Sequence, residues 1–140
     1  MKAPDWSALT GDATAAAKVL ADIQRDLSLT ADPFEKAVML LGAETCYSML
    51  GQTEEARQAL TQARQIAPED NPFVQMHADY HEARLCSTED RFQESLDKFD
   101  EMLTKYRQDL KDPDNRYLYE EIQIRLLWRF SKGAPRPCHY

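Results

Sequence analysis

The sequence contains little glycine and no long hydrophobic run. Only 4 of its 140 residues are Gly, whereas phosphate-binding loops and sheet-rich folds usually need more, so helices are favoured. No stretch approaches the roughly 20 apolar residues that a membrane-spanning helix requires. The first thirty residues also lack the uninterrupted apolar segment of a signal peptide. These absences predict a soluble, mainly helical protein without membrane association.

Cysteine is also scarce, and acidic residues outnumber basic ones. Cys46 and Cys86 fall in helical segments among apolar neighbours, and the third cysteine is Cys138. An odd number of thiols disfavours a disulfide framework, so we expect reduced thiols and a cytoplasmic location. The formal net charge is −7, and Lys and Arg are scattered among acidic residues. The chain therefore lacks the basic patch that nucleic-acid binding needs, and its partners should be basic or apolar.

Regularly spaced start and stop signals predict six helices. Asp32 and Pro33 form one start signal, with Asp as the N-cap and Pro at the first helical position. Gly51 ends that helix, and Thr53 is expected to cap the next one. The predicted helices cover residues 12–28, 33–50, 53–66, 72–86, 91–108 and 115–131. Short connections between them imply antiparallel neighbours.

One helix pair has the spacing of a known repeat. The positions that carry the pattern are Leu40, Ala43, Glu44, Tyr47, Gly51, Ala56, Leu60, Ala63 and Pro68. Together they resemble one tetratricopeptide repeat, which the resemblance places at residues 37–70. Small residues such as Ala56 stand where the paired helices cross, and large ones such as Leu60 fill the space between them. Glu44 departs from the pattern, because a small residue is usual there.

A second, degenerate copy is expected at residues 76–109. It comes into register when Ser95 takes the place of Ala56, an offset of 39 residues. With the helices at 12–28 and 115–131 as outer layers, the prediction is an all-α, tetratricopeptide-like antiparallel solenoid. It forms a single domain over residues 1–132, followed by a flexible tail at 133–140. The alternative is an unrelated helical bundle.

The resemblance implies a groove lined by the first helix of each repeat, where another protein or a peptide segment binds. Carried over by register, the groove residues are Leu41, Thr45, Ser48, Met49, His77, Tyr80, His81 and Arg84. The alternative is that several of them pack against the last helix. One subfamily binds acidic chaperone tails through Lys and Asn at the positions of Leu41 and Thr45. That activity is therefore not expected.

No group of residues points to catalysis or to a cofactor. His77 and His81 lie four residues apart on one predicted helix, a spacing that provides half of a zinc site. A third ligand is missing, and Ala78 stands where a metalloprotease would need Glu. We expect no metal and no catalytic residue. A metal binder or an enzyme around these histidines is the least favoured reading.

The last predicted helix is apolar around more than one face. Such a helix is usually buried on both sides, so we expect an interface at Tyr117, Ile124, Trp128 and Phe130. The alternative is that the segment with Trp6 and Leu9 covers it. The overall prediction is a non-catalytic interaction module, an adaptor or chaperone-like binder. The alternative is a structural subunit or homodimer that completes a larger complex.

Overall fold

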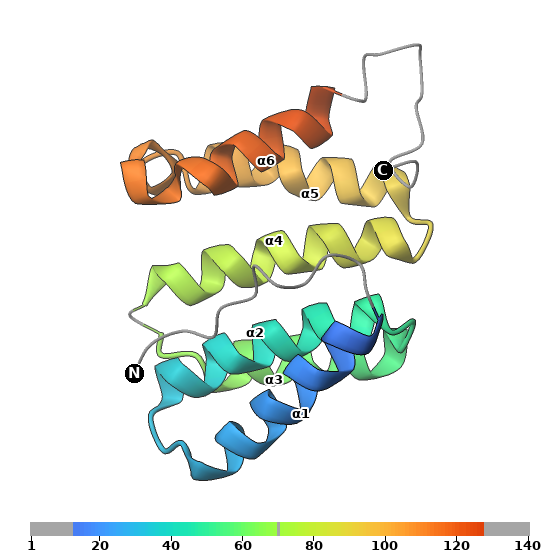
Figure 1. The fold of residues 1–140 in the computed structure, drawn as a ribbon. Helices are drawn as coiled ribbons and strands as arrows, with labels where there is room; N and C mark the ends of the chain where they lie inside the picture. The colour runs from blue at the N-terminus through green and yellow to red at the C-terminus, as the bar shows by residue number, and fades with distance from the viewer. Residues whose placement is uncertain (1–12, 70, 128–140) are drawn as a thin grey trace. The chain divides into compact units, whose positions relative to one another are not determined.

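The computed structural model describes residues 13–69 and 71–127, and these residues are almost entirely helical (Figure 1). The six α-helices are α1 (Ala13–Leu29), α2 (Pro33–Met49), α3 (Thr53–Ile66), α4 (Pro72–Thr88), α5 (Phe92–Lys105) and α6 (Arg116–Leu127). Two short 3-10 helices, η1 (Asp109–Lys111) and η2 (Pro113–Asn115), connect α5 to α6. Within the described ranges no strand is present. The predicted all-α class and the number of helices are therefore confirmed.

The chain divides into two compact units, Met1–His81 and Glu82–Tyr140. The sequence predicts one domain over 1–132, whereas the contacts separate inside α4. Helices that are neighbours along the sequence contact each other within each unit, as α2 does with α3 and α5 does with α6. None of the helices in the described part of the chain is long and apolar enough to cross a membrane.

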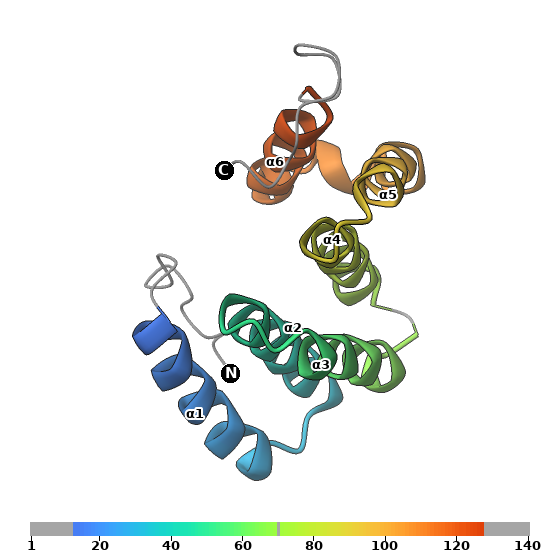
Figure 2. The ribbon, with the colours of Figure 1, turned by 90° about the vertical axis from the view of Figure 1, so that its right-hand side faces the viewer.

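In the first unit α2 lies between α1 and α3 (Figure 2). Nine of its residues, from Ala37 to Cys46, are buried, because helices cover it on more than one side. On α3, Ala56 and Ala63 are fully buried at the positions where the repeat pattern predicts close helix contact. Gln24 of α1 donates a hydrogen bond to the Tyr47 hydroxyl at 3.1 Å. This links the first helix to the predicted repeat.

The helix start signals are confirmed in one case and wrong in another. Asp32 caps α2, and its carboxylate accepts a hydrogen bond from the Glu35 amide at 2.9 Å. At α3 the N-cap is Gln52, and it makes no side-chain cap bond. Thr53 is the first helical residue, so the prediction that it caps the helix is wrong. The preceding turn determines where α3 starts, because its closing hydrogen bond, from Gln52 N–H to Tyr47 O, ends one residue before Thr53.

The turns after α2 and α4 have the same backbone geometry. Gly51 has φ of 76° and Asp90 has φ of 62°, both in the left-handed region. In the first turn Gln52 N–H bonds to Tyr47 O at 2.8 Å, and in the second Arg91 N–H bonds to Cys86 O at 2.9 Å. Each turn thus ends its helix with a Schellman motif. The two turns are related by an offset of 39 residues (90 − 51), which is the offset that aligns the two predicted repeats.

In the second unit α5 packs against α6, with Phe99 and Met102 of α5 and Leu118 and Ile122 of α6 in the core. Ser95 is buried, and its hydroxyl donates to Ala83 O at 2.6 Å. Ser95 therefore occupies a helix crossing, as Ala56 does in the first unit. Helix α5 ends at Lys105, earlier than the predicted residue 108, because the chain tightens into η1. The predicted end of α6 at 131 lies outside the described residues.

Candidate functional site

The predicted groove residues of α2 have little exposed surface. Leu41 is only 2% exposed, and Thr45, Ser48 and Met49 are half-buried. The Thr45 hydroxyl donates to Leu41 O at 3.3 Å, within its own helix. Leu41 thus belongs to the core of the first unit in this structure. The role of these four α2 residues in partner binding stays a prediction.

A buried polar cluster lies between α2 and α4. Glu44 is 0% exposed. Its carboxylate accepts a hydrogen bond from Ser48 Oγ at 2.6 Å and contacts Nδ1 of His81. Burial of a carboxylate is unfavourable unless it is paired and hydrogen-bonded, and here it is both. The cluster therefore joins α2 to α4 through polar contacts inside the first unit.

The serine and the histidine of this cluster both contact Glu44. Ser48 Oγ donates to the Glu44 carboxylate, and Nδ1 of His81 contacts the same carboxylate. Sequence reasoning placed Ser48 and His81 in the groove and treated Glu44 only as a departure from the repeat. The sequence feature that could have predicted the Glu44–His81 pair was Glu44 itself, because a carboxylate buried where two helices cross needs a polar partner.

The two histidines of α4 have different surroundings. His81 is buried against Glu44, and the ring of Tyr80 meets it edge-on at 5.7 Å. His77 is half-buried, and its ring lies 4.2 Å from the ring of Phe73. Among the residues that the structure describes, no group of three or more His, Cys, Asp or Glu side chains is placed to hold a metal ion. The remaining predicted groove residue, Arg84, is half-buried and belongs to the second unit.

We expect His77 to make folding stability depend on pH. Burial, and then the nearby charge of His81, lowers the pKa of His77 from 6.5 to about 4. Between these values the unfolded chain binds more protons than the folded chain, so stability falls as pH falls through this window. The change in unfolding free energy is measured by urea unfolding of the wild type and of His77→Gln at about pH 7.5 and about pH 5. The variant should lose less stability on acidification, and equal losses would contradict the assignment.

Helix α6 has two distinct apolar faces. Leu118, Ile122 and Leu126 recur at i, i+4 and i+8 and are buried. Tyr117, Ile124 and Leu127 recur at i, i+7 and i+10 and are 60%, 48% and 60% exposed. The second set is called the outer face of α6 below. Two predicted interface residues, Tyr117 and Ile124, lie on it.

The other two predicted interface residues, Trp128 and Phe130, lie outside the described residues. Charged pairs flank the outer face within α6 itself. Arg116 Nε bonds to Glu120 at 2.9 Å, and Arg125 Nε bonds to Glu121 at 2.8 Å. Each pair joins residues four apart on the helix, so the charges near the outer face largely neutralise one another. A partner at this face would meet mainly apolar surface.

No family model matches the chain, and neither a curated protein nor a solved structure matches it. The tetratricopeptide resemblance therefore remains an interpretation of the sequence pattern.

Proposed function

We propose that the chain is a non-catalytic protein-interaction module built from two helical repeats of the tetratricopeptide type. The two equivalent turns at Gly51 and Asp90 support the repeat assignment. The buried crossings at Ala56 and Ser95 lie at the same offset and support it further. Cys46 and Cys86 are buried free thiols, as expected of a protein that acts in the reducing cytoplasm.

The single observation that carries the proposal is the outer face of α6. In a stacked repeat, a helix face that no other helix covers is usually polar, because it meets water. Here Tyr117, Ile124 and Leu127 form an exposed apolar stripe at helical spacing. Stripes of this kind receive an amphipathic helix whose apolar face packs along them. The partner we propose is such a helix of another protein, bound in an adaptor or chaperone-like complex.

Site-specific photo-crosslinking tests the outer face directly. A photoreactive residue is placed at Ile124, and at Thr104, an exposed position of α5, in a matched control. We expect the probe at 124 to form a discrete adduct with one partner protein in cells, and the probe at 104 not to form it. The adduct should disappear when Leu127→Glu is added, because a buried unpaired charge opposes apolar packing. Equal labelling from both positions would refute the proposal.

A second candidate is a structural subunit in which the outer face joins two copies of this chain. The same exposed stripe favours it, since an isologous interface uses one apolar patch on both copies. Sedimentation separates the two candidates. A dimer that Ile124→Glu converts to monomer, with the crosslink at 124 formed between copies, supports the subunit. A monomeric wild type supports the adaptor.

A further inference from the structure

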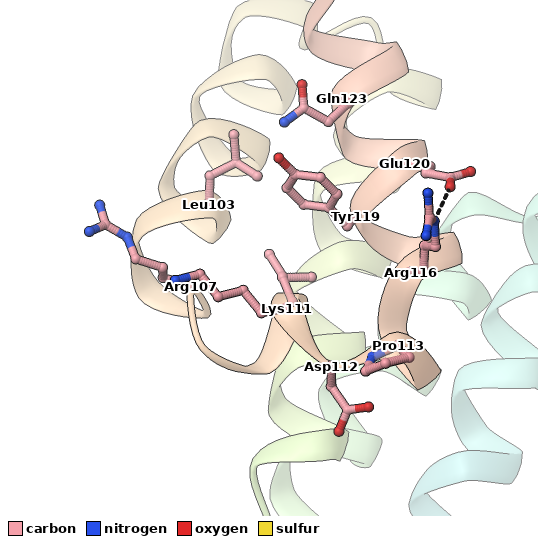
Figure 3. Close-up of a pocket in the computed structure, with 10 residues that line it drawn as sticks. Leu103, Arg107, Lys111, Asp112, Pro113, Arg116, Tyr119, Glu120 and Gln123 are labelled. Carbon is pink, nitrogen blue, oxygen red and sulfur yellow. Dashed lines mark hydrogen bonds and ion pairs between the residues drawn. The ribbon is translucent and has the colours of Figure 1, made fainter.

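The second unit contains a pocket that the proposed function does not use. It lies between the end of α5, the η1–η2 connection and the start of α6, and its volume is about 590 Å³ (Figure 3). Pockets for small organic ligands typically measure roughly 300–1,000 Å³. All lining residues belong to the second unit. The pocket is separate from the outer face of α6, whose three residues do not line it.

Hydrogen bonds hold the connection that forms one wall of the pocket. Asn115 Nδ2 donates to Asp109 O at 2.8 Å, and the Asn115 amide donates to Asp112 O at 2.9 Å. Asp112 also caps the next turn, because its carboxylate accepts from the Asp114 amide at 2.9 Å. In Figure 3 the carboxylate of Asp112 points away from the other lining side chains. The negative charge of Asp112 therefore lies at the Asp114 amide that it caps.

The inner surface of the pocket is largely apolar. Leu103 of α5 and Tyr119 of α6 point toward each other across it (Figure 3). Leu110, which is buried, and Pro113 line it from the connection. An apolar group of several carbon atoms would replace water against these side chains, which favours binding by the hydrophobic effect.

Three cationic side chains line the same pocket. Arg107 and Lys111 are exposed, and neither side chain has an ion pair or hydrogen bond within the part of the chain that the structure describes. By contrast, the third cation, Arg116, is bonded to Glu120 at 2.9 Å. Two positive charges without an ion pair therefore lie beside an apolar surface, in a chain of net charge −7. They give the pocket a local preference for a negatively charged group.

Two neutral hydrogen-bond donors near these cations also favour a carboxylate ligand. In the described residues, neither the Tyr119 hydroxyl nor the side-chain amide of Gln123 has a hydrogen-bond partner. Both groups lie between α5 and α6 in Figure 3. A carboxylate accepts hydrogen bonds from guanidinium, ammonium, hydroxyl and amide donors alike. Glu120 also lines the pocket, and its negative charge opposes a doubly charged phosphate more than a singly charged carboxylate.

We propose that this pocket binds a ligand that carries one carboxylate on an apolar body. The carboxylate pairs with Arg107 and Lys111, and the apolar body lies against Leu103 and Tyr119. This assignment does not depend on the proposed function, because the pocket and the outer face of α6 are formed by different residues.

Octanoate is the probe for the test, followed by amide chemical shifts and calorimetry on the full chain. We expect saturable binding, with shift changes concentrated between Leu103 and Gln123. Matched probes are acetate, octylamine and inorganic phosphate, all of which should bind more weakly. Octylamine or phosphate binding as tightly as octanoate would overturn the proposal. So would octanoate shifts located outside this segment.

A charge-reversal variant gives the decisive comparison. Arg107→Glu/Lys111→Glu should weaken octanoate at least about tenfold, since it removes two charge-assisted contacts. Lys18→Glu, an exposed position of α1, is the control and should change nothing. Circular dichroism checks that both variants fold. Undiminished octanoate affinity in the folded double variant would refute the site.

A second arm identifies the source of the carboxylate. Octanoate represents a free acid, and the peptide acetyl-Leu-Glu-Phe-amide represents an acidic side chain between apolar residues. Tighter octanoate binding assigns the pocket to a small-molecule ligand. Tighter peptide binding that depends on Arg107 and Lys111 assigns it to a protein segment. Binding of neither probe would overturn the proposal.

Discussion

Replacing Glu44 by alanine should lower the unfolding free energy of the first unit by about 3–5 kcal/mol. The substitution leaves His81 buried without its carboxylate, and it removes the acceptor of the Ser48 hydroxyl. Breaking one side of a buried pair is costly because the remaining polar group has lost its water and its partner. Urea denaturation followed by circular dichroism measures the loss.

The matched control is Glu55→Ala, an exposed glutamate in the first turn of α3. It should cost under about 1 kcal/mol, since it removes only a favourable interaction with the helix dipole. Replacing both partners, Glu44→Leu with His81→Leu, should restore most of the stability, because an apolar pair needs no desolvated charges. Equal effects of Glu44→Ala and Glu55→Ala would show that the cluster is not the buried pair described above.

Phe99→Ala should destabilise the second unit by about 3–5 kcal/mol. Phe99 is 1% exposed in the core between α5 and α6. The guanidinium of Arg125 lies 5.5 Å from its ring centre, so truncation also removes a cation–π contact. The loss combines transfer of the ring to water with a cavity that the neighbours fill only in part.

Hydrogen exchange of individual amides locates this effect. We expect amides of α5 and α6 to lose protection most, because stability in stacked helices is transmitted mainly between neighbours. Phe92→Ala, at the start of α5, is the control. Its side chain is half-buried, so its loss should be smaller. A uniform loss of protection across both units would contradict the division of the chain at His81.

Much of the fold could be predicted from local signals. Asp32, Pro33 and Gly51 act within a few residues of the chain, through capping, a fixed φ and access to the left-handed region. The periodicity of apolar residues then predicts the helices between these signals. The equivalence of the two turns also followed from sequence, because Asp90 and Ser95 occupy the places of Gly51 and Ala56 at a constant offset.

The candidate site was predicted only in part. Tyr117 and Ile124 were expected at an interface and are exposed on one face of α6. The opposite face of the same helix is buried in the core. The apolar composition of the helix did not predict which of its two faces would be buried and which exposed. Leu41 was expected in a groove and is buried, since helix register predicts which way a side chain points and not what covers it.

The sequence by itself determined the helical class, the helix boundaries to within a few residues and the offset between the two equivalent turns, because each depends on interactions between residues close along the chain. Tertiary structure alone decided the pairing of Glu44 with His81, 37 residues apart, and the placement of Arg107 and Lys111 beside Tyr119. Both depend on how helices pack and how the η1–η2 connection folds. Helix packing and loop conformation depend on burial, shape and charge in segments that are distant along the chain. Patterns within a short stretch of sequence do not predict them.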